Sequence, residues 1–304
     1  MNRFDQLEDA LRLACPGLEV RRNEPMSRHT SFRIGGPVAV MALPKGEAQL
    51  LAALQVAREL EITPVPLGNG SNLLCSDGPI DCFVIRLLDG LDTLELLPEN
   101  RIRCGAGVLL ARLAAFAQKH ALTGLEFASG IPGTLGGGAV MNAGAYGGEL
   151  KDVLVETRCV TLDGEMQTFR GKEQGFGYRR SAFAGGDKIV LSGLLQLAPG
   201  DGAAIKARMD ELNQRRRSKQ PLEYPSAGST FKRPVGGFAA ALIQQCGLKG
   251  LTVGGAQVSE KHSGFIINKG GATCADVLAL AQQVHDIVQA ETGISLELEI
   301  KRLG

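Results

Sequence analysis

Long apolar runs are absent from this chain of 304 residues, and no stretch reaches the roughly 18 consecutive apolar residues that a membrane-spanning helix needs. The first residues, MNRFDQLEDALRLACPG, mix acidic with apolar side chains, which favours an amphipathic helix over a secretory signal peptide. We therefore expect a soluble, cytoplasmic protein without membrane insertion.

An excess of charge is missing as well, because 33 basic side chains stand against 32 acidic ones and leave a formal net charge of +1. Domains that bind nucleic acids or anionic membranes usually present a strongly basic surface. The charge balance thus predicts no nucleic-acid partner and favours a small molecule. Nothing in the sequence points to an obligatory protein partner.

Cysteines and histidines with the spacing of a metal site or a disulfide framework are not found. The seven cysteines are an odd number without any C-x-x-C pair, and the four histidines show no metal-ligand spacing. We expect reduced, buried thiols and no metal.

Two common nucleotide-binding signatures are missing too. The segment Gly68-x-Gly70-x-x-Leu73 lacks the third glycine of the dinucleotide fingerprint, and no G-x-x-x-x-G-K-[ST] loop occurs. A Rossmann site or a P-loop is therefore disfavoured.

Glycine, by contrast, is concentrated between Gly130 and Glu149, GIPGTLGGGAVMNAGAYGGE, where eight glycines stand in place of the roughly one or two that average usage predicts. Such a cluster indicates a backbone that turns through positive φ or lies directly against something bulky. Exposed backbone N–H groups bind anions, and a smooth segment can lie against a flat ring. The segment therefore predicts a site for a large, phosphorylated, planar ligand. A tight junction between two packed sheets is the alternative.

A second glycine-containing loop, GNGSNLL from Gly68 to Leu74, follows a helical run from Glu47 to Glu61 and a strand-like run from Ile62 to Leu67. A loop directly after a strand suits phosphate binding, since glycine lets backbone donors face the oxygens while asparagine and serine add side-chain donors. An ordinary turn stabilised by its asparagines is the alternative.

The rest of the chain predicts two domains, as its length suggests. Asp163-Gly164 between apolar runs predicts a β-hairpin. A Pro/Gly-rich break followed by a charged helix from Ala203 to Lys219 places the domain boundary near residue 199. A last strand is expected from Ile294 to Leu303. Its alternation puts Glu297 and Glu299 on one polar face, for which a solvated surface is the ordinary explanation.

Five segments occur in order over nearly the whole chain: GNGSNLL, the glycine-rich segment, FGYRRSAF (176–183), PSAGSTFKRP (225–234) and the terminal LELEIKRLG. Together they closely resemble the UDP-N-acetylenolpyruvylglucosamine reductase (MurB) family of flavoproteins. The resemblance implies the α+β class, with a two-subdomain FAD-binding fold of the vanillyl-alcohol-oxidase (PCMH) type in residues 1–198, its core at about 31–196. A smaller α+β substrate-binding domain at 199–304 would follow.

Members of this family use FAD and NADPH to reduce UDP-N-acetylglucosamine enolpyruvate to UDP-N-acetylmuramate, a step of peptidoglycan synthesis in cell wall biogenesis. The resemblance implies the same sugar nucleotide and NADPH as small-molecule partners here. We expect noncovalent FAD, because no histidine lies in either glycine-rich loop and Cys75 is expected to pack as a small apolar residue.

The catalytic residues that the resemblance implies are Arg179 in FGYR, Ser229 in AGS and Glu299 in LELEIK. In the family, hydride passes from the flavin to one carbon of the double bond and the serine proton reaches the other. The arginine and the glutamate stabilise the negative charge that develops on the carboxylate. A guanidinium suits this task because it binds a planar carboxylate bidentately and keeps its charge. Resemblance alone selects Glu299 over Glu297.

Binding residues are implied in the same way. Substrate phosphates would meet Lys219, Lys232 and Arg233, although many relatives have asparagine at the last position, and Tyr146 would face both substrate and cofactor. The cofactor-binding set comprises Leu67, Gly68, Asn69, Gly70, Ser71, Asn72, Leu73, Gly130, Ile131, Pro132, Gly133, Gly136, Gly137, Asn142, Ala143, Gly144 and Tyr146.

The chain resembles the shorter class of the family. About fifty positions separate Arg179 from Ser229, too few for the inserted loop whose tyrosine closes over the substrate in the longer class. Tyr224 is therefore not assigned to that task. Two other functions stay open: a flavin oxidoreductase of the same fold acting on a hydroxy acid or alcohol, and a non-catalytic flavin- or nucleotide-sugar-binding protein.

Overall fold

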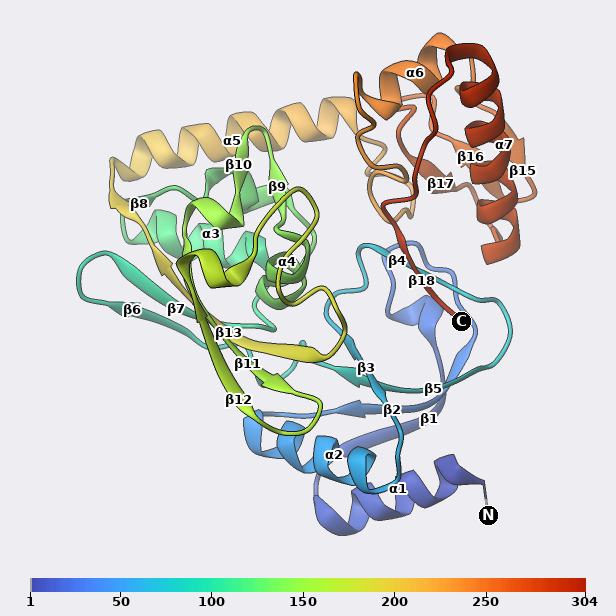
Figure 1. The fold of residues 1–304 in the computed structure, drawn as a ribbon. Coiled ribbons are helices and arrows are strands. Elements are labelled where there is room, and N and C mark those ends of the chain that lie inside the picture. The colour runs from blue at the N-terminus through green and yellow to red at the C-terminus, as the bar shows by residue number, and fades with distance from the viewer. Residues whose placement is uncertain (1) are drawn as a thin grey trace. The chain divides into compact units, whose positions relative to one another are not determined.

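The computed structural model describes residues 2–304 and contains two compact units (Figure 1). The first unit comprises the residues up to Arg22 together with Ala39–Asn69 and Cys82–Arg215. The second unit comprises Asn23–Val38, Gly70–Asp81 and Arg216–Gly304. This division differs from the expected one at residue 199, because two short segments from the amino-terminal third belong with the carboxy-terminal third. Of the described helices, none is long and apolar enough to cross a membrane.

A four-stranded sheet, most of it in the first unit, has the order β1 (Glu19–Pro25), β2 (Pro37–Leu43), β5 (Ile80–Arg86), β3 (Pro64–Leu67), with β3 and β5 parallel. The helices α1 (Arg3–Ala14) and α2 (Glu47–Glu59) pack against one another beside it (Figure 1). A capping box between Asn2 and Asp5 begins α1, which buries Phe4, Leu7 and Leu11 on one face.

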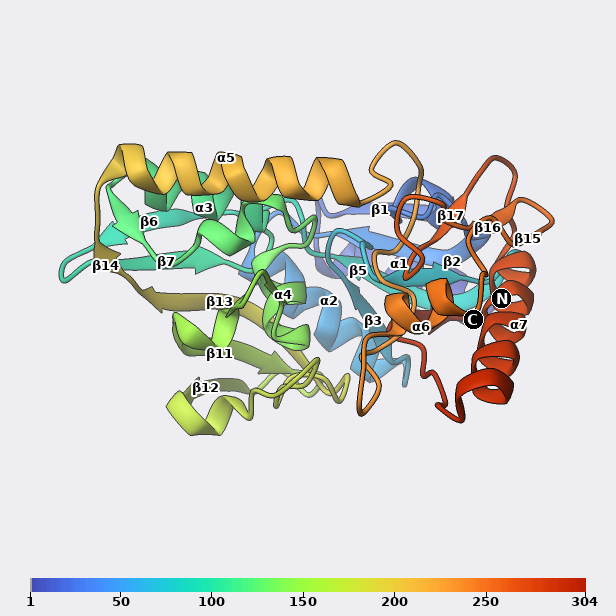
Figure 2. The same ribbon diagram turned by 90° about the horizontal axis from the view of Figure 1, so that it is seen from above.

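The larger sheet of the first unit is antiparallel. Its order is β12 (Met166–Arg170), β11 (Leu154–Thr161), β13 (Lys188–Gln196), β7 (Arg101–Gly105), β6 (Leu94–Leu97), as Figure 2 shows. The predicted hairpin at Asp163-Gly164 is confirmed, since Val160 pairs with Met166 and Gly164 has φ +90°. The remaining elements of the unit are α3 (Leu110–Lys119), β8 (Leu122–Thr123), η2 (Glu126–Gly130), α4 (Leu135–Met141), β9 (Gly144–Ala145), β10 (Gly148–Glu149), η3 (Leu150–Asp152), η4 (Gly171–Gln174) and β14 (Ala198–Pro199).

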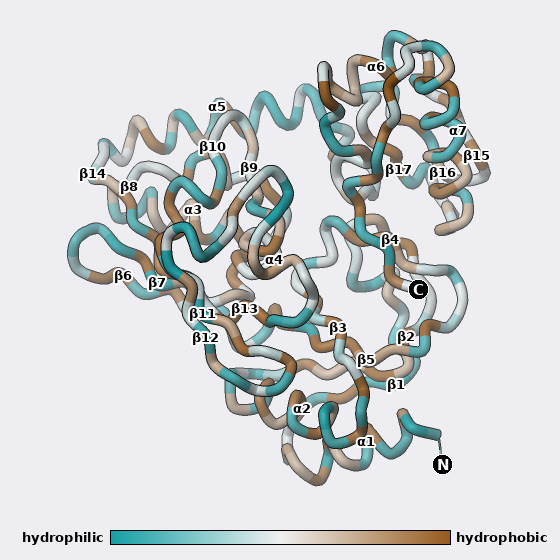
Figure 3. Tube along the Cα trace, viewed as in Figure 1, coloured by the Kyte–Doolittle hydropathy of each residue, from teal (hydrophilic) through white to brown (hydrophobic). Residues whose placement is uncertain are grey.

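Helix α5 (Gly202–Lys219) begins in the first unit and ends in the second. Ile205 and Leu212 are its buried residues, and Figure 3 shows it hydrophilic along most of its length. A helix that is polar nearly all round gains little from burial and is typical of a connection between compact bodies.

The second unit contains the sheet β15 (Thr252–Val253), β16 (Ala256–Val258), β17 (Ile266–Asn268), the helices α6 (Ala239–Gln245) and α7 (Cys274–Thr292), and the 3-10 turn η1 (Met26–Arg28). A capping box from Thr273 begins α7, and Gly293 with φ +72° ends it. Its apolar face, with Val277, Leu280 and Val284 fully buried, contributes to the core of this unit.

Backbone pairing explains why residues 70–81 belong to the second unit. Strand β4 (Leu73–Cys75) pairs in parallel with β18 (Lys301–Leu303). Ser76 N donates to Leu303 O at 2.9 Å, and Gly36 N donates to Ser76 O at 2.7 Å. A segment directly after the first predicted cofactor loop is thus tied to the end of the chain.

The predicted strand from Ile294 to Leu303 is wrong over most of its length. Regular pairing is limited to β18, and upstream of it Leu298 forms one isolated bridge with Phe231. Alternation in sequence predicts two faces, but an element joined by single bridges does not present one continuous polar face to solvent. The two glutamates of this stretch accordingly have different surroundings, as shown below.

Candidate functional site

The two glycine-containing loops of the sequence meet within the first unit. Asn69 Nδ2 donates to Pro132 O at 2.5 Å. A Cβ atom added at Gly68 would lie 2.8 Å from Thr134 Oγ1, so a side chain at this position would displace the threonine. Leu67, the last residue of β3, holds the start of the loop because its carbonyl accepts from Leu87 N at 2.8 Å. The predicted residues Leu67–Asn69 and Gly130–Gly133 therefore form one cluster.

Backbone donors are left open at this junction. Among residues 2–304, no hydrogen-bond acceptor lies in range of the N–H groups of Gly68, Asn69, Gly133 or Thr134. Native proteins satisfy nearly all such groups with protein, water or ligand, and neighbouring free N–H groups form concave sites for anions. These four donors suit the diphosphate of a dinucleotide cofactor.

The short helix that follows contributes no such donors, because its first turn is satisfied internally. Leu135 N donates to Val108 O at 2.8 Å, Gly136 N to Ala106 O at 2.9 Å, and Gly137 N to Thr134 Oγ1 at 3.3 Å. Thr134 is the N-cap of α4. The anion-binding capacity therefore belongs to the loops and not to the helix end.

The glycines of α4 have two different surroundings. Gly136 and Gly138 are buried, and added Cβ atoms would lie 3.0 Å from Ala106 Cβ and 2.8 Å from Leu150 Cδ1. Gly137 between them is exposed. Part of the glycine excess thus serves close packing of a helix, which differs from the expected alternative of a junction between two sheets. Of the three glycines of α4, only Gly137 offers a bare backbone to solvent.

A type I′ hairpin presents Tyr146. Strands β9 and β10 pair Ala145 with Gly148, and the two turn residues Tyr146 and Gly147 have φ +53° and +90°. Tyr146 as a whole residue is 41% exposed. Positive φ is costly for a bulky residue and is often found at functional sites. Of the neighbouring predicted residues, Gly144 begins this hairpin and Ala143 N donates to Gly138 O at 2.8 Å.

Asn142 is buried and uses its side-chain amide within the protein. Its Nδ2 donates to Glu149 Oε2 at 2.8 Å and to Gly177 O at 3.0 Å, while its Oδ1 accepts from Lys151 N at 3.0 Å. With φ +43° it also ends α4. Sequence reasoning missed this network, since nothing in the sequence pairs Asn142 with Glu149, Lys151 or Gly177.

The network holds the turn that carries Arg179. Gly177 and Arg180 form an isolated bridge, and Arg179 within that turn has φ +51° and is half-buried. Its guanidinium lies 5.4 Å from the ring centre of Tyr178. The hydrogen bond from Lys151, with those from Asn142 and the charge of Arg179, holds the pKa of Glu149 below its usual value. Glu149 therefore faces cations while it fixes Asn142.

In the second unit the first cofactor loop continues through Gly70. Its φ is +58°, and a Cβ there would lie 2.0 Å from His29 O, so only glycine fits. Ser31 N donates to Gly70 O at 3.2 Å. Asn72 links the loop to the chain end, because its Nδ2 donates to Glu299 O at 3.2 Å and its carbonyl accepts from Lys301 N at 2.9 Å. Ser71 is half-buried, and Leu73 begins β4.

Ser229 and Glu299 lie on neighbouring segments of this unit. Glu299 N donates to Thr230 O at 2.8 Å, Phe231 bridges Leu298, and Lys232 N donates to Glu297 O at 2.8 Å. Ser229 follows Gly228, whose φ is +78°. The Ser229 hydroxyl is half-buried and has no hydrogen-bond partner in the described part of the chain. It is therefore available to a ligand, and the structure brings two of the three predicted catalytic residues together.

The ordinary explanation for the two glutamates, a solvated face, does not hold for Glu299, which is only 8% exposed. Glu297 is exposed, with Oε2 2.8 Å from Lys232 Nζ, and this ion pair lowers the pKa of Glu297. The irregular backbone of 294–300 turns the two side chains into different surroundings. Burial thus distinguishes Glu299 from Glu297, which the sequence pattern did not.

The three residues predicted to bind phosphate differ in the contacts that their charged groups already make. Lys219, the last residue of α5, is exposed and makes no ion pair with any described residue. Lys232 is held by Glu297, and the Arg233 guanidinium lies 4.3 Å from the ring centre of Phe238, which is 60% exposed. Lys219 ends α5, whereas Lys232 and Arg233 lie in the irregular segment between the Phe231 bridge and α6.

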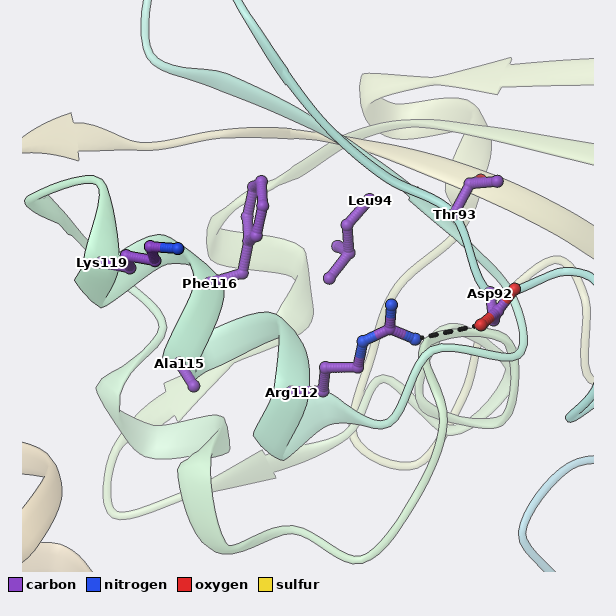
Figure 4. Close-up of a pocket in the computed structure, with 7 residues that line it drawn as sticks. All are labelled: Asp92, Thr93, Leu94, Arg112, Ala115, Phe116 and Lys119. Carbon is purple, nitrogen blue, oxygen red and sulfur yellow. Dashed lines mark hydrogen bonds and ion pairs between the residues drawn. The ribbon is translucent and has the colours of Figure 1, made fainter.

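A depression of about 480 Å³ lies in the first unit between α3 and β6 (Figure 4). The Arg112 side chain points toward Asp92 there, with Nη1 3.2 Å from Asp92 Oδ2. Its lining consists of Asp92, Thr93, Leu94, Arg112, Ala115, Phe116 and Lys119. None of these is a predicted site residue. Within residues 2–304, no group of three or more His, Cys, Asp or Glu side chains could hold a metal ion.

Comparison with known proteins agrees with the geometry. Residues 38–170 match the family model of an FAD binding domain, and residues 220–303 match that of the UDP-N-acetylenolpyruvoylglucosamine reductase C-terminal domain. Together with the open donors of the first unit, these matches define a flavin-binding protein of the predicted α+β class, whose FAD-binding fold is followed by a smaller α+β domain.

Individual relatives are more specific. The UDP-N-acetylenolpyruvoylglucosamine reductase of Clostridioides difficile is 46% identical over 94% of either chain. That of Geobacillus thermodenitrificans is 45% identical over 100% of this chain and 99% of the relative. The crystal structure of the reductase (MurB) from Thermus caldophilus matches with a TM-score of 0.82 and 36% identity, over 94% of this chain and 100% of that one. The chain belongs to the UDP-N-acetylenolpyruvoylglucosamine reductase family.

Proposed function

We propose that this protein is a UDP-N-acetylmuramate dehydrogenase, which uses FAD and NADPH to reduce UDP-N-acetylglucosamine enolpyruvate in peptidoglycan synthesis. Family membership over nearly the whole chain supports the reaction. The observation that supports FAD as the cofactor is the cluster of four backbone N–H groups without an acceptor in the described chain, where the two glycine-containing loops meet. FAD, when bound, supplies the hydride that it has received from NADPH.

The residues of the first unit fit the cofactor by their chemistry. Gly68, Asn69, Gly133 and Thr134 offer uncharged N–H donors, which bind a diphosphate without an added cation. Gly137 leaves bare backbone nearby, where a flat ring could approach. We propose noncovalent binding by this cluster, with Gly70–Leu73 completing the same loop.

Arg179 is proposed to bind the enolpyruvyl carboxylate. A guanidinium forms two parallel hydrogen bonds to a carboxylate and stays charged as negative charge grows on the substrate. The left-handed conformation of Arg179, held by the Asn142 network, presents this group in one fixed turn. Preorganised charge of this kind lowers the barrier because it needs no rearrangement during the reaction.

Ser229 is proposed to give its hydroxyl proton to the carbon that does not receive hydride. A hydroxyl is a weak acid, so this step requires a strongly basic carbon and close positioning. The hydroxyl has no partner among residues 2–304, so it is free to donate toward the substrate. Glu299 is buried, and its backbone N–H donates to the carbonyl of Thr230, the residue after Ser229. Glu299 is proposed to stabilise, together with Arg179, the negative charge that develops on the substrate carboxylate.

Lys219, Lys232 and Arg233 are proposed to meet the phosphates of the sugar nucleotide. Lys219 is the strongest candidate, because its charge is not neutralised by a neighbouring carboxylate. Both proposed substrates are charged, water-soluble molecules, which favours a cytoplasmic site of action. Through wall synthesis the enzyme would also contribute to cell shape and cell division.

An absorption spectrum of the purified protein tests the proposal. A yellow protein should be bleached by NADPH without oxygen and should recover its flavin spectrum when UDP-N-acetylglucosamine enolpyruvate is added. Bleaching without substrate-dependent recovery would indicate another flavin oxidoreductase. A protein that stays colourless with added FAD would reject a flavin enzyme altogether.

A further inference from the structure

The segment His29–Phe32 of the second unit joins the cofactor loop to the loop before Ser229. Ser31 N donates to Gly70 O at 3.2 Å. Ser31 Oγ donates to Ser226 O at 2.6 Å, three residues before Ser229. One residue thus contacts both loops, through its backbone on one side and its hydroxyl on the other.

The segment itself is firmly held. His29 Nε2 lies 2.8 Å from Glu24 Oε1, and both side chains are nearly buried, at 6% and 11% exposure. Thr30 Oγ1 donates to Ile34 O at 3.1 Å, and Phe32 is fully buried. Asn268 Nδ2 donates to Phe32 O at 3.3 Å. The hydroxyl of Ser31 therefore projects from a rigid support.

The loop before Ser229 depends on that support. On its carboxy-terminal side, Thr230 is fixed by Gly264 O at 2.8 Å, by Ile266 N at 2.9 Å on its hydroxyl, and by Glu299 N at 2.8 Å on its carbonyl. On its amino-terminal side, Pro225 O accepts from Asn268 N at 2.9 Å and Ser226 O accepts from Ser31. Gly228, with φ +78° and no atom near its Cβ position, lies between them.

The Ser31 hydrogen bond is thus the last anchor that the described chain provides for the segment before Gly228. Because the Ser229 hydroxyl has no described protein partner, its position is set by the backbone alone. A misplacement of about 1 Å can slow an oriented reaction step by about 100-fold. We propose that Ser31 is a positioning residue that holds Ser229 in place for proton transfer to the substrate, an inference that rests on the proposed function.

The test separates the two half-reactions in stopped flow, with the full-length protein and its FAD. In Ser31→Ala, recovery of the flavin spectrum with UDP-N-acetylglucosamine enolpyruvate should slow by about 10- to 100-fold at saturating substrate. Bleaching by NADPH and retention of FAD should stay as in the parent protein, because the backbone N–H to Gly70 remains. The solvent deuterium isotope effect on recovery should increase, since proton transfer becomes more rate-limiting.

A threonine and a valine at position 31 have the same shape and differ by the hydroxyl. Ser31→Thr should restore recovery and Ser31→Val should not. The pair also decides the question if the alanine variant fails to fold. Thr292→Ala is the matched control. The Thr292 hydroxyl also donates to a backbone carbonyl of the same unit, that of Val288 at 2.7 Å, and it lies at the carboxy-terminal end of α7. It should leave both half-reactions unchanged.

Recovery at the parent rate in Ser31→Ala, equal slowing of both half-reactions, or equal behaviour of the threonine and valine variants would overturn the inference. Each of these outcomes presupposes that the parent protein is bleached and recovers. A parent protein that does not recover with this substrate would instead reject the proposed function, so the two failures are distinguishable.

Discussion

Arg179 lies in a tight turn of the first unit, and the conformation of that turn depends on side chains: the amide of Asn142 and the carboxylate of Glu149. Ser229 lies in an irregular segment of the second unit, which is held on its carboxy-terminal side by backbone hydrogen bonds of Thr230 and on its amino-terminal side by the Ser31 hydroxyl, which donates to Ser226 O. The two predicted catalytic residues are thus positioned in different ways. A side-chain network can be disrupted by one substitution, whereas a backbone pairing tolerates most substitutions and responds to loss of its anchors.

The largest effect is expected for a substitution that removes the chemistry of Ser229 and keeps the hydrogen bonds that hold its loop. Ser229→Ala removes the proton donor and leaves the backbone intact, so recovery with substrate should slow by about 10³-fold, as general acid catalysis allows. Bleaching by NADPH should be nearly unchanged because no proton is needed from Ser229 in that half. Rapid-scan absorbance measures both rates. Equal slowing of the two halves would reject the assignment.

Next in size, Arg179→Lys keeps the charge but loses the two-pronged hydrogen bonding to a carboxylate. Turnover should fall by about 10²-fold. Arg180→Lys, on the exposed neighbouring residue of the same turn, is the control and should stay within about twofold of the parent, as surface substitutions usually do. Steady-state kinetics distinguishes the two variants. Similar losses in both would mean that the turn matters and not the guanidinium.

A smaller effect is expected when Glu297 and Glu299, two residues apart, are substituted separately and the two variants are compared. Glu299→Gln should lower turnover by about 30-fold, the equivalent of about 2 kcal/mol for a hydrogen bond to a charged group. Glu297→Gln, at an exposed ion pair, should change turnover and stability little. Steady-state assays and thermal unfolding give both values. If Glu297→Gln proved the more damaging, the assignment by burial would fail.

The smallest effect tests the side-chain network directly. Asn142→Asp places a carboxylate opposite that of Glu149 and opposite Gly177 O, so it should loosen the Arg179 turn, cost about 1–3 kcal/mol of unfolding free energy and lower turnover by about tenfold. Gln118→Glu is the matched control, because its amide also donates to a backbone carbonyl, that of Gly202, at 3.0 Å in the same unit. It should lose stability without a comparable loss of turnover. A loss of turnover equal to that of the control would show that Asn142 acts only through stability.

Sequence patterns predicted the local elements well where the signal was local. Apolar periodicity and turn residues located α2 and the β11–β12 hairpin, because these depend on neighbours within a few residues. The same reasoning failed at residues 294–300, where an alternating pattern belongs to an irregular segment. There, isolated contacts with residues 230–232 determine the backbone, and they lie far away in sequence.

The site shows the same limit. Glycine content indicated two ligand loops, but not that Gly136 and Gly138 are glycine for packing while Gly68 and Gly133 leave donors open. The segment HTSFRIGG (29–36) has no role in any of the sequence-based predictions. Its connection from Gly70 to Ser226 appears only when segments about 40 and 195 residues away are brought next to Ser31.

The motifs and their order were enough to identify the family and, through that resemblance, the flavin cofactor and the three catalytic candidates Arg179, Ser229 and Glu299, because a motif is recognised from residue types along the chain without knowledge of contacts. Which of two glutamates is buried, which amides are left without partners and which hydroxyl supports the Ser229 loop depended on the folded chain. Burial and hydrogen bonding depend on segments that are far apart in sequence but in contact in the fold. The sequence of one segment alone does not show which other segment it contacts.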